Sequence, residues 1–162
     1  MTAANPTLSR ATTRAFGVAG IRLALGIATI GACAVRGVAL RSALLGVVLG
    51  GVVLTMIALG QSSRAGLRPE KEWLPVPAEA KHDPAWLGPL LACIPSTAGV
   101  AVMIVVALVS SPVLASILAG VMLALGALAV VSGFELAGRE RRDGVRLWVG
   151  RGPRPALYVS AR

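Results

Sequence analysis

Four long apolar runs constrain this chain more than any other feature of its sequence. They span residues 16–35, 38–60, 89–110 and 112–136, and each is at least 20 residues long. About 20 apolar residues in a helix cross the ~30 Å hydrocarbon core of a bilayer, because a helix rises 1.5 Å per residue. Soluble helices carry charges along one face, whereas the second and third runs hold only Arg41, near an end. We therefore expect four transmembrane helices.

The composition agrees with this interpretation. Only 14% of the residues are charged, against about 25% in a typical soluble domain. The 19 glycines suit membrane helices, whose interfaces favour small residues, and aromatic residues make up only 4%. The formal net charge of +9 raises the question of nucleic acid. However, the basic residues flank the apolar runs and form no basic helix face, so we expect no nucleic-acid partner.

Short links between the runs predict two hairpins. The first and second runs are joined by Arg36 and Gly37, and the third and fourth by the serines before Pro112. One helix over residues 89–136 would be ~72 Å long, more than twice the thickness of the bilayer core. The chain must turn, and Ser111 is expected to cap a helix that begins at Pro112. The predicted fold is an all-α integral membrane protein with four transmembrane helices arranged as two antiparallel hairpins.

The distribution of basic residues predicts the orientation. The chain divides into an N-terminal segment (1–15), a first hairpin (16–60), a Pro-rich loop (61–88), a second hairpin (89–136) and a basic tail (137–162). The three segments outside the hairpins share one side and hold 13 Lys and Arg, against two on the other side. By the positive-inside rule that side is cytoplasmic. We expect a multi-pass protein of the cell inner membrane with both termini in the cytoplasm, and the excess of Arg over Lys favours a bacterial source.

The Pro-rich loop is too highly charged to support a packed core of its own, and its prolines break regular elements. Trp73 and Trp86 are expected at the level of the lipid headgroups, where interfacial aromatic residues lie. In the tail, residues 146–149 and 156–159 flank a Gly/Pro-rich connection and are predicted to pair as a short β-hairpin. Such a hairpin is marginal when isolated in water.

Arg22 is the one charge well inside a predicted span. Glu135 lies at the cytoplasmic end of the fourth span, in the same leaflet, and is predicted to form an ion pair with Arg22. A second interpretation is that Arg22 extends its guanidinium group to the headgroups. A third is a substrate or ion site, the default hypothesis for an ionisable residue inside the membrane.

Small residues recur every four positions on two of the predicted helices, which places them on one face and allows close helix contact. They are Ser42, Gly46 and Gly50 in the second run, and Ser116, Gly120 and Ala124 in the fourth. Packing within the chain is favoured over a dimer interface.

Pro95 interrupts the third run and predicts a helix kink, with the hydroxyls of Ser96 and Thr97 available to the freed carbonyl. Broken helices also mark transporter sites when they occur as corresponding pairs. The first hairpin has no matching proline, so a plain kink is favoured.

Cys33 and Cys93 are predicted to lie in opposite leaflets, too far apart for a disulfide. Residues 30–33, after a short apolar stretch and three arginines, allow an alternative in which the chain is cleaved before Cys33 and acylated there. The lone His82 does not make a metal site, and no phosphate-binding glycine motif occurs. We predict no metal or cofactor.

No catalytic constellation is found in the sequence. We expect a non-enzymatic accessory or scaffold subunit of a membrane system. Its partners are the lipid bilayer, anionic lipid headgroups that contact the Arg-rich tail, and a protein partner or further copies of the chain. The alternative function is a small oligomeric transporter or channel.

Overall fold

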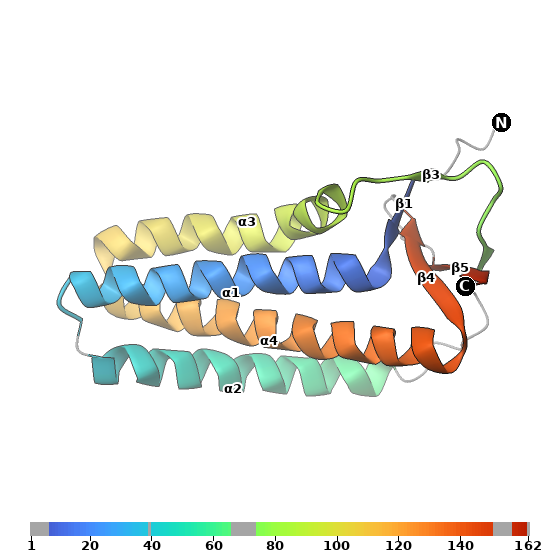
Figure 1. Ribbon diagram of the computed structural model, residues 1–162. Coiled ribbons are helices and arrows are strands. Elements are labelled where there is room, and N and C mark those ends of the chain that lie inside the picture. The colour runs from blue at the N-terminus through green and yellow to red at the C-terminus, as the bar shows by residue number, and fades with distance from the viewer. Residues whose placement is uncertain (1–6, 39, 66–73, 151–156, 162) are drawn as a thin grey trace.

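Four long helices lie side by side, and a small β-sheet covers one end of them (Figure 1). The computed structural model describes residues 7–38, 40–65, 74–150 and 157–161. The helices are α1 (Ala11–Val35), α2 (Leu40–Ala65), α3 (Leu87–Ser110) and α4 (Pro112–Arg142). Three of them contain a whole predicted apolar run, and α2 contains the second run from residue 40 onward. The main differences are at the sheet end, where α1 begins five residues before its run and α4 continues six residues beyond its run into polar sequence.

Helix α4 is the centre of the bundle. It packs along α1 on one side and along α2 on the other, while α3 packs against α1 and α4. Helices α1 and α2 are consecutive in sequence, but they scarcely touch. The two hairpins therefore interlock, with α4 of the second hairpin lying between the two helices of the first.

Both helical turns are made by the residues that the sequence indicates. Gly37 adopts a positive φ of 77°, which glycine tolerates, directly after the end of α1. Ser111 is extended, and its hydroxyl accepts a hydrogen bond from the Leu114 amide at 3.5 Å. Pro112 follows as the first residue of α4. The predicted cap at the second turn is confirmed.

The sheet has five strands in the order β2-β5-β4-β1-β3. They are β1 (Thr7–Arg10), β2 (Leu74–Pro75), β3 (Lys81–His82), β4 (Val145–Gly150) and β5 (Leu157–Ala161). Strand β1 pairs antiparallel with β4 and parallel with β3, and β2 pairs parallel with β5. Strands β4 and β5 are antiparallel, with Trp148 opposite Tyr158, which confirms the predicted tail hairpin.

The all-α prediction is therefore wrong at this end of the molecule. The N-terminal segment and the Pro-rich loop each contribute strands that the sequence did not predict. These strands are two to four residues long, too short to show the alternation by which a strand is recognised. They are stabilised by pairing with distant segments: Leu8 lies opposite both His82 and Gly150.

Helices α1 and α4 are long and apolar enough to cross a membrane, and α3 is a third if its two bent parts form one span. In α2 the described apolar segment, Leu44–Met56, would extend only about 20 Å. Large apolar side chains are exposed along the helices, such as Ile27 (64%) and Val109 (76%). The structure thus supports two spanning helices, and the four-span arrangement stays a prediction.

Candidate functional site

The guanidinium of Arg22 on α1 is bound by two hydroxyls on α3. Its Nε donates to Thr97 Oγ1 at 3.1 Å, and its Nη2 donates to Ser96 Oγ at 3.0 Å. Thr97 is buried and Arg22 partly buried. Helices α1 and α3 both begin at the sheet end of the bundle. Arg22 lies 11 residues into α1, about 16 Å from the start of that helix, and the direct hydrogen bond shows that Thr97 lies at the same level.

The predicted ion pair between Arg22 and Glu135 is not formed. Among the described residues, the one salt bridge joins Arg10 to Glu140. Glu135 is exposed on α4, seven residues before that helix ends. It therefore lies only about 10 Å from the sheet end, nearer to it than Arg22, and the hydroxyls of α3 are level with the guanidinium. Equal depth in adjoining helices was the signal that sequence reasoning missed.

Helix α3 bends where these hydroxyls lie. Its two parts, Leu87–Ile94 and Ser96–Ser110, differ in direction by 61°. Pro95, the predicted kink residue, lies at this junction, and its side chain is outside the described part of the structure. Ser96 and Thr97 are the first two residues of the second part. Their hydroxyls accept hydrogen bonds from Arg22. A guanidinium carries five N–H donors, so this cluster has further donors for water or an anion.

The small residues pack α2 against α4. A Cβ added at Gly46 would lie 2.6 Å from Ser116 Oγ, and one at Gly50 would lie 2.6 Å from the Val121 amide nitrogen. From the other side, a Cβ at Gly120 would meet the backbone of Val47 at 2.5 Å. These contacts are within one chain. Ala124 is partly buried further along α4, and the side chain of Ser42 is outside the described residues.

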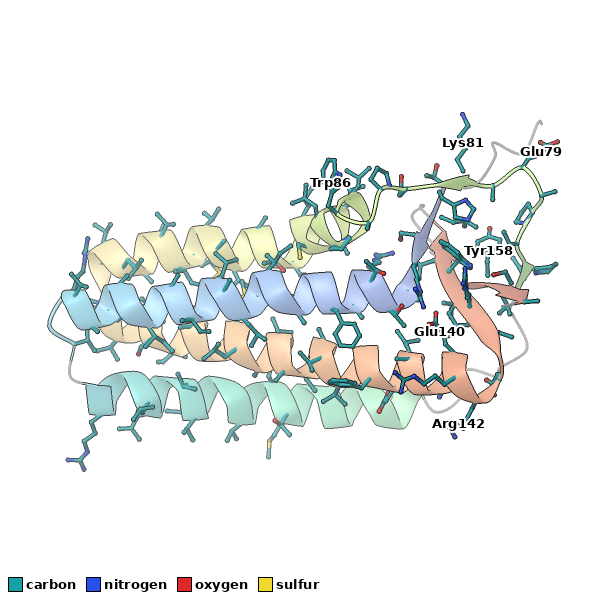
Figure 2. The ribbon with its side chains drawn as sticks, viewed as in Figure 1. Glu79, Lys81, Trp86, Glu140, Arg142 and Tyr158 are labelled. Atoms are coloured by element: carbon teal, nitrogen blue, oxygen red, sulfur yellow. The ribbon has the colours of Figure 1, made fainter. Side chains whose placement is uncertain are left out.

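Glu140 joins three elements at the sheet end of the bundle, and the sequence analysis did not identify it. One carboxylate oxygen accepts a hydrogen bond from Arg10 Nη2 at 3.0 Å, and the other from the Leu147 amide at 3.0 Å. Figure 2 shows Glu140 on the last turns of α4, beneath the strands. A carboxylate near a helix C-terminus is electrostatically unfavourable. Its occurrence there was a sign that it has partners elsewhere.

Basic side chains surround Glu140 and its partners. Arg139, Arg141 and Arg142 lie in the last turn of α4, and Arg146 lies on β4; all four are exposed. Two of them, Arg141 and Arg146, line a cavity of about 290 Å³ together with Arg10 of β1 and Thr12 and Thr13 of α1. We call this arginine-rich sheet end, from the strands to the last turn of α4, the basic cap.

The opposite end of the bundle is held by backbone acceptors. Arg36 Nη1 donates to the Leu108 carbonyl at 2.6 Å, which satisfies one of the open carbonyls at the C-terminal end of α3. Cys33 is buried against Ala107 and Ala115. Its thiol donates weakly to the Pro112 carbonyl at 3.6 Å. Acylation at Cys33 after cleavage would require the loss of most of α1.

The other residues that the sequence analysis singled out are the cysteines, His82 and the two tryptophans. Cys93 is buried, and neither cysteine is in a disulfide. His82 is exposed on β3 and its ring meets that of Trp148 edge to face, with centroids 4.5 Å apart. Trp86 is exposed just before α3, and Trp73 is outside the described residues. The part of the chain that the structure describes holds no group of three metal-ligating side chains.

Comparison with known proteins gives no relative for this arrangement. No protein-family model, curated protein or solved structure matches the chain.

Proposed function

We propose that this chain is a four-span accessory or scaffold protein of the bacterial inner membrane. Its N-terminal segment, central loop and tail form the basic cap on the cytoplasmic side. In this proposal the bundle anchors the protein in lipid, and the cap is the surface that meets anionic headgroups and a protein partner. No enzymatic step is part of the proposal.

The observation that carries the proposal is the composition of the sheet. Strands from three segments separated by pairs of helices meet in one sheet at one end of the bundle. For these segments to lie on one side of a membrane, the helices between two successive segments must cross the membrane an even number of times. Four spans satisfy this requirement, and so would none. The apolar side chains exposed along α1 to α4 favour four spans, because a soluble bundle would bury them.

Charge supports the orientation. Lys81 and the arginines of the cap lie at the sheet end (Figure 2), whereas Arg36 and Arg41 lie at the other end. The positive-inside rule places the richer end in the cytoplasm. Reporter fusions after Arg162 and after Gly37 test this directly. We expect a cytoplasmic readout after Arg162 and an external readout after Gly37; an external reporter after Arg162 contradicts the proposal.

A transporter or channel is the second candidate, and the Arg22 cluster favours it. A cation that lies beside a bent helix, with hydroxyls around it, resembles the polar sites of membrane transporters in its chemistry. Two sets of variants distinguish the two candidate functions. Each variant is expressed in a strain that lacks the gene, and the measurement is whether it restores the wild-type phenotype. If the protein is a scaffold, we expect Arg22→Gln to restore the wild-type phenotype, and we expect the double variant Arg141→Glu, Arg146→Glu not to restore it. The transport candidate expects the reverse.

A further inference from the structure

A groove runs between α1 and α4 at the sheet end of the bundle. Its volume is about 400 Å³, and its walls are mostly apolar: Ala15 and Val18 come from α1, and Leu125 and Ala129 come from α4. Val149 and Leu157 contribute from the sheet. These two residues are opposite each other in the β4–β5 pair, so this pair of inner strands borders the groove where the helices meet the cap.

The charges that line this groove are both positive. Arg14 and Arg22 line it, and no acidic residue does among those that the structure describes. They are eight residues apart on α1, about 12 Å along its axis, with Arg14 nearer to the cap. Arg22 already binds Thr97 and Ser96. Arg14 forms no salt bridge within the described residues, although it also lines a smaller cavity of about 230 Å³ beside Asp83.

We propose that this groove binds an anionic phospholipid of the inner leaflet, with an acyl chain along the apolar walls and the phosphate at Arg14. The inference rests on the proposed membrane orientation. Basic pockets between transmembrane helices on the cytoplasmic side bind anionic headgroups. Here the basic residue lies at the end of the groove where the headgroup layer would be, and the apolar walls extend toward the bilayer interior.

Charge argues against a second copy of the chain as the occupant. In a two-fold symmetric dimer the same surface patch meets itself. Both copies would then bring Arg14 and Arg22 into one interface without an acidic side chain from the described groove lining to offset them, and like charges at an interface are unfavourable. A lipid phosphate brings the opposite charge, and an acyl chain is narrow enough to lie between two helices.

Native mass spectrometry of the full chain, released from nanodiscs, tests the proposal. The nanodiscs contain equal amounts of phosphatidylglycerol and phosphatidylcholine with the same acyl chains. We expect the wild type to retain phosphatidylglycerol preferentially. Arg14→Gln is expected to reduce this preference about fivefold, since one arginine near the surface contributes about 1 kcal/mol. Arg41→Gln removes an exposed charge at the other end of the bundle, outside both the groove and the basic cap, and is expected to leave the preference within twofold.

A second pair of variants tests the walls without changing charge. Ala129→Phe fills the groove, whereas Ala127→Phe adds the same ring at an exposed position of α4 outside it. We expect lipid retention to fall at least fivefold in the first variant alone. Thermal unfolding in detergent establishes that both variants are folded. Equal retention by the two, or an equal effect of Arg14→Gln and Arg41→Gln, overturns the proposal.

Two further outcomes separate this inference from the function on which it depends. Correct topology with no preference for phosphatidylglycerol overturns the lipid site alone. An external C-terminus overturns the proposed orientation and, with it, an inner-leaflet lipid. Oxidative cross-linking of Ala129→Cys into a dimer that retains no phospholipid would show that a second copy occupies the groove.

Discussion

Arg10 and Glu140 form a salt bridge of 3.0 Å although 130 residues separate them in the sequence. Arg10 precedes α1 directly, and Glu140 lies in the last turn of α4. The Glu140 side chain is only 8% exposed, whereas that of Arg10 is 47% exposed. The carboxylate also accepts the Leu147 amide. The contact therefore ties the first strand and the last helix to the sheet.

Glu140→Ala is expected to destabilise the protein more than Arg10→Ala. The first change leaves the Leu147 amide without its acceptor and Arg10 without its counter-charge, which costs about 2–3 kcal/mol. The second removes a half-exposed partner and costs about 1 kcal/mol or less. Chemical unfolding in detergent, followed by circular dichroism, measures both. Equal losses would show that the amide contact contributes little.

Arg22 and Thr97 are expected to show energetic coupling of about 1 kcal/mol. Hydrogen bonds between membrane helices are commonly worth 0.6–2 kcal/mol, and this one involves a charged donor. A double-mutant cycle with Arg22→Met and Thr97→Val measures the coupling. The matched control is the cycle of Arg22→Met with Glu135→Gln, for which we expect a value near zero. A larger coupling energy between Arg22 and Glu135 would show that the ion pair suggested by the sequence is formed.

Two adjacent glycines of α2 are expected to respond differently to alanine. A Cβ at Gly50 would lie 2.6 Å from the Val121 backbone nitrogen, whereas one at Gly51 meets nothing within 4 Å. Gly50→Ala must displace α4 and is expected to cost about 1–3 kcal/mol. Gly51→Ala is expected to be neutral or stabilising, since alanine favours the helix. Thermal unfolding in detergent compares the two; similar losses would contradict this packing of α2 on α4.

Cys33 and Cys93 are not expected to cross-link within a monomer. Cys33 lies near the far end of α1, and Cys93 lies near the start of α3 at the sheet end. The difference in depth is about 24 Å, well beyond the ~7 Å limit between the Cα atoms of a disulfide. Oxidation and non-reducing peptide mapping test this.

A positive control for that experiment is available in the sheet. Arg146 and Ser160 are opposite each other in the β4–β5 pair, where Cα atoms are about 4.5–5.5 Å apart. The double variant Arg146→Cys, Ser160→Cys is therefore expected to form the bridge under the same oxidation. A Cys33–Cys93 bridge would require a different arrangement of the helices.

The features that the sequence predicts well are local ones. The four helices follow from apolar runs of fixed length, and the turn into α4 follows from one serine before one proline. The tail hairpin joins strands that are neighbours in sequence. Gly46, Gly50 and Gly120 were recognisable from their spacing. In each case the signal and its consequence lie within a few residues, or on one face of one helix.

The features that the sequence does not predict depend on how distant segments meet. Strand β1 is four residues long and exists because Leu8 finds partners in both β3 and β4. The partners of Arg22 depend on which helix adjoins α1 and at what depth. Sequence reasoning selected the residue of opposite charge, Glu135. The structure instead pairs Arg22 with neutral hydroxyls at its own level.

The position of β1 in the sheet also sets the order in which the protein can be completed. β1 is the first element within the described residues, yet it lies between β3, made after two helices, and β4, made after all four. During synthesis the edge of β1 that pairs with β4 stays unpaired until α4 has been made and has reached its place. Unpaired strand edges promote aggregation. The β1–β4 pairing thus forms only after all four helices have been made, and a chain that fails to place α4 leaves this edge of β1 exposed.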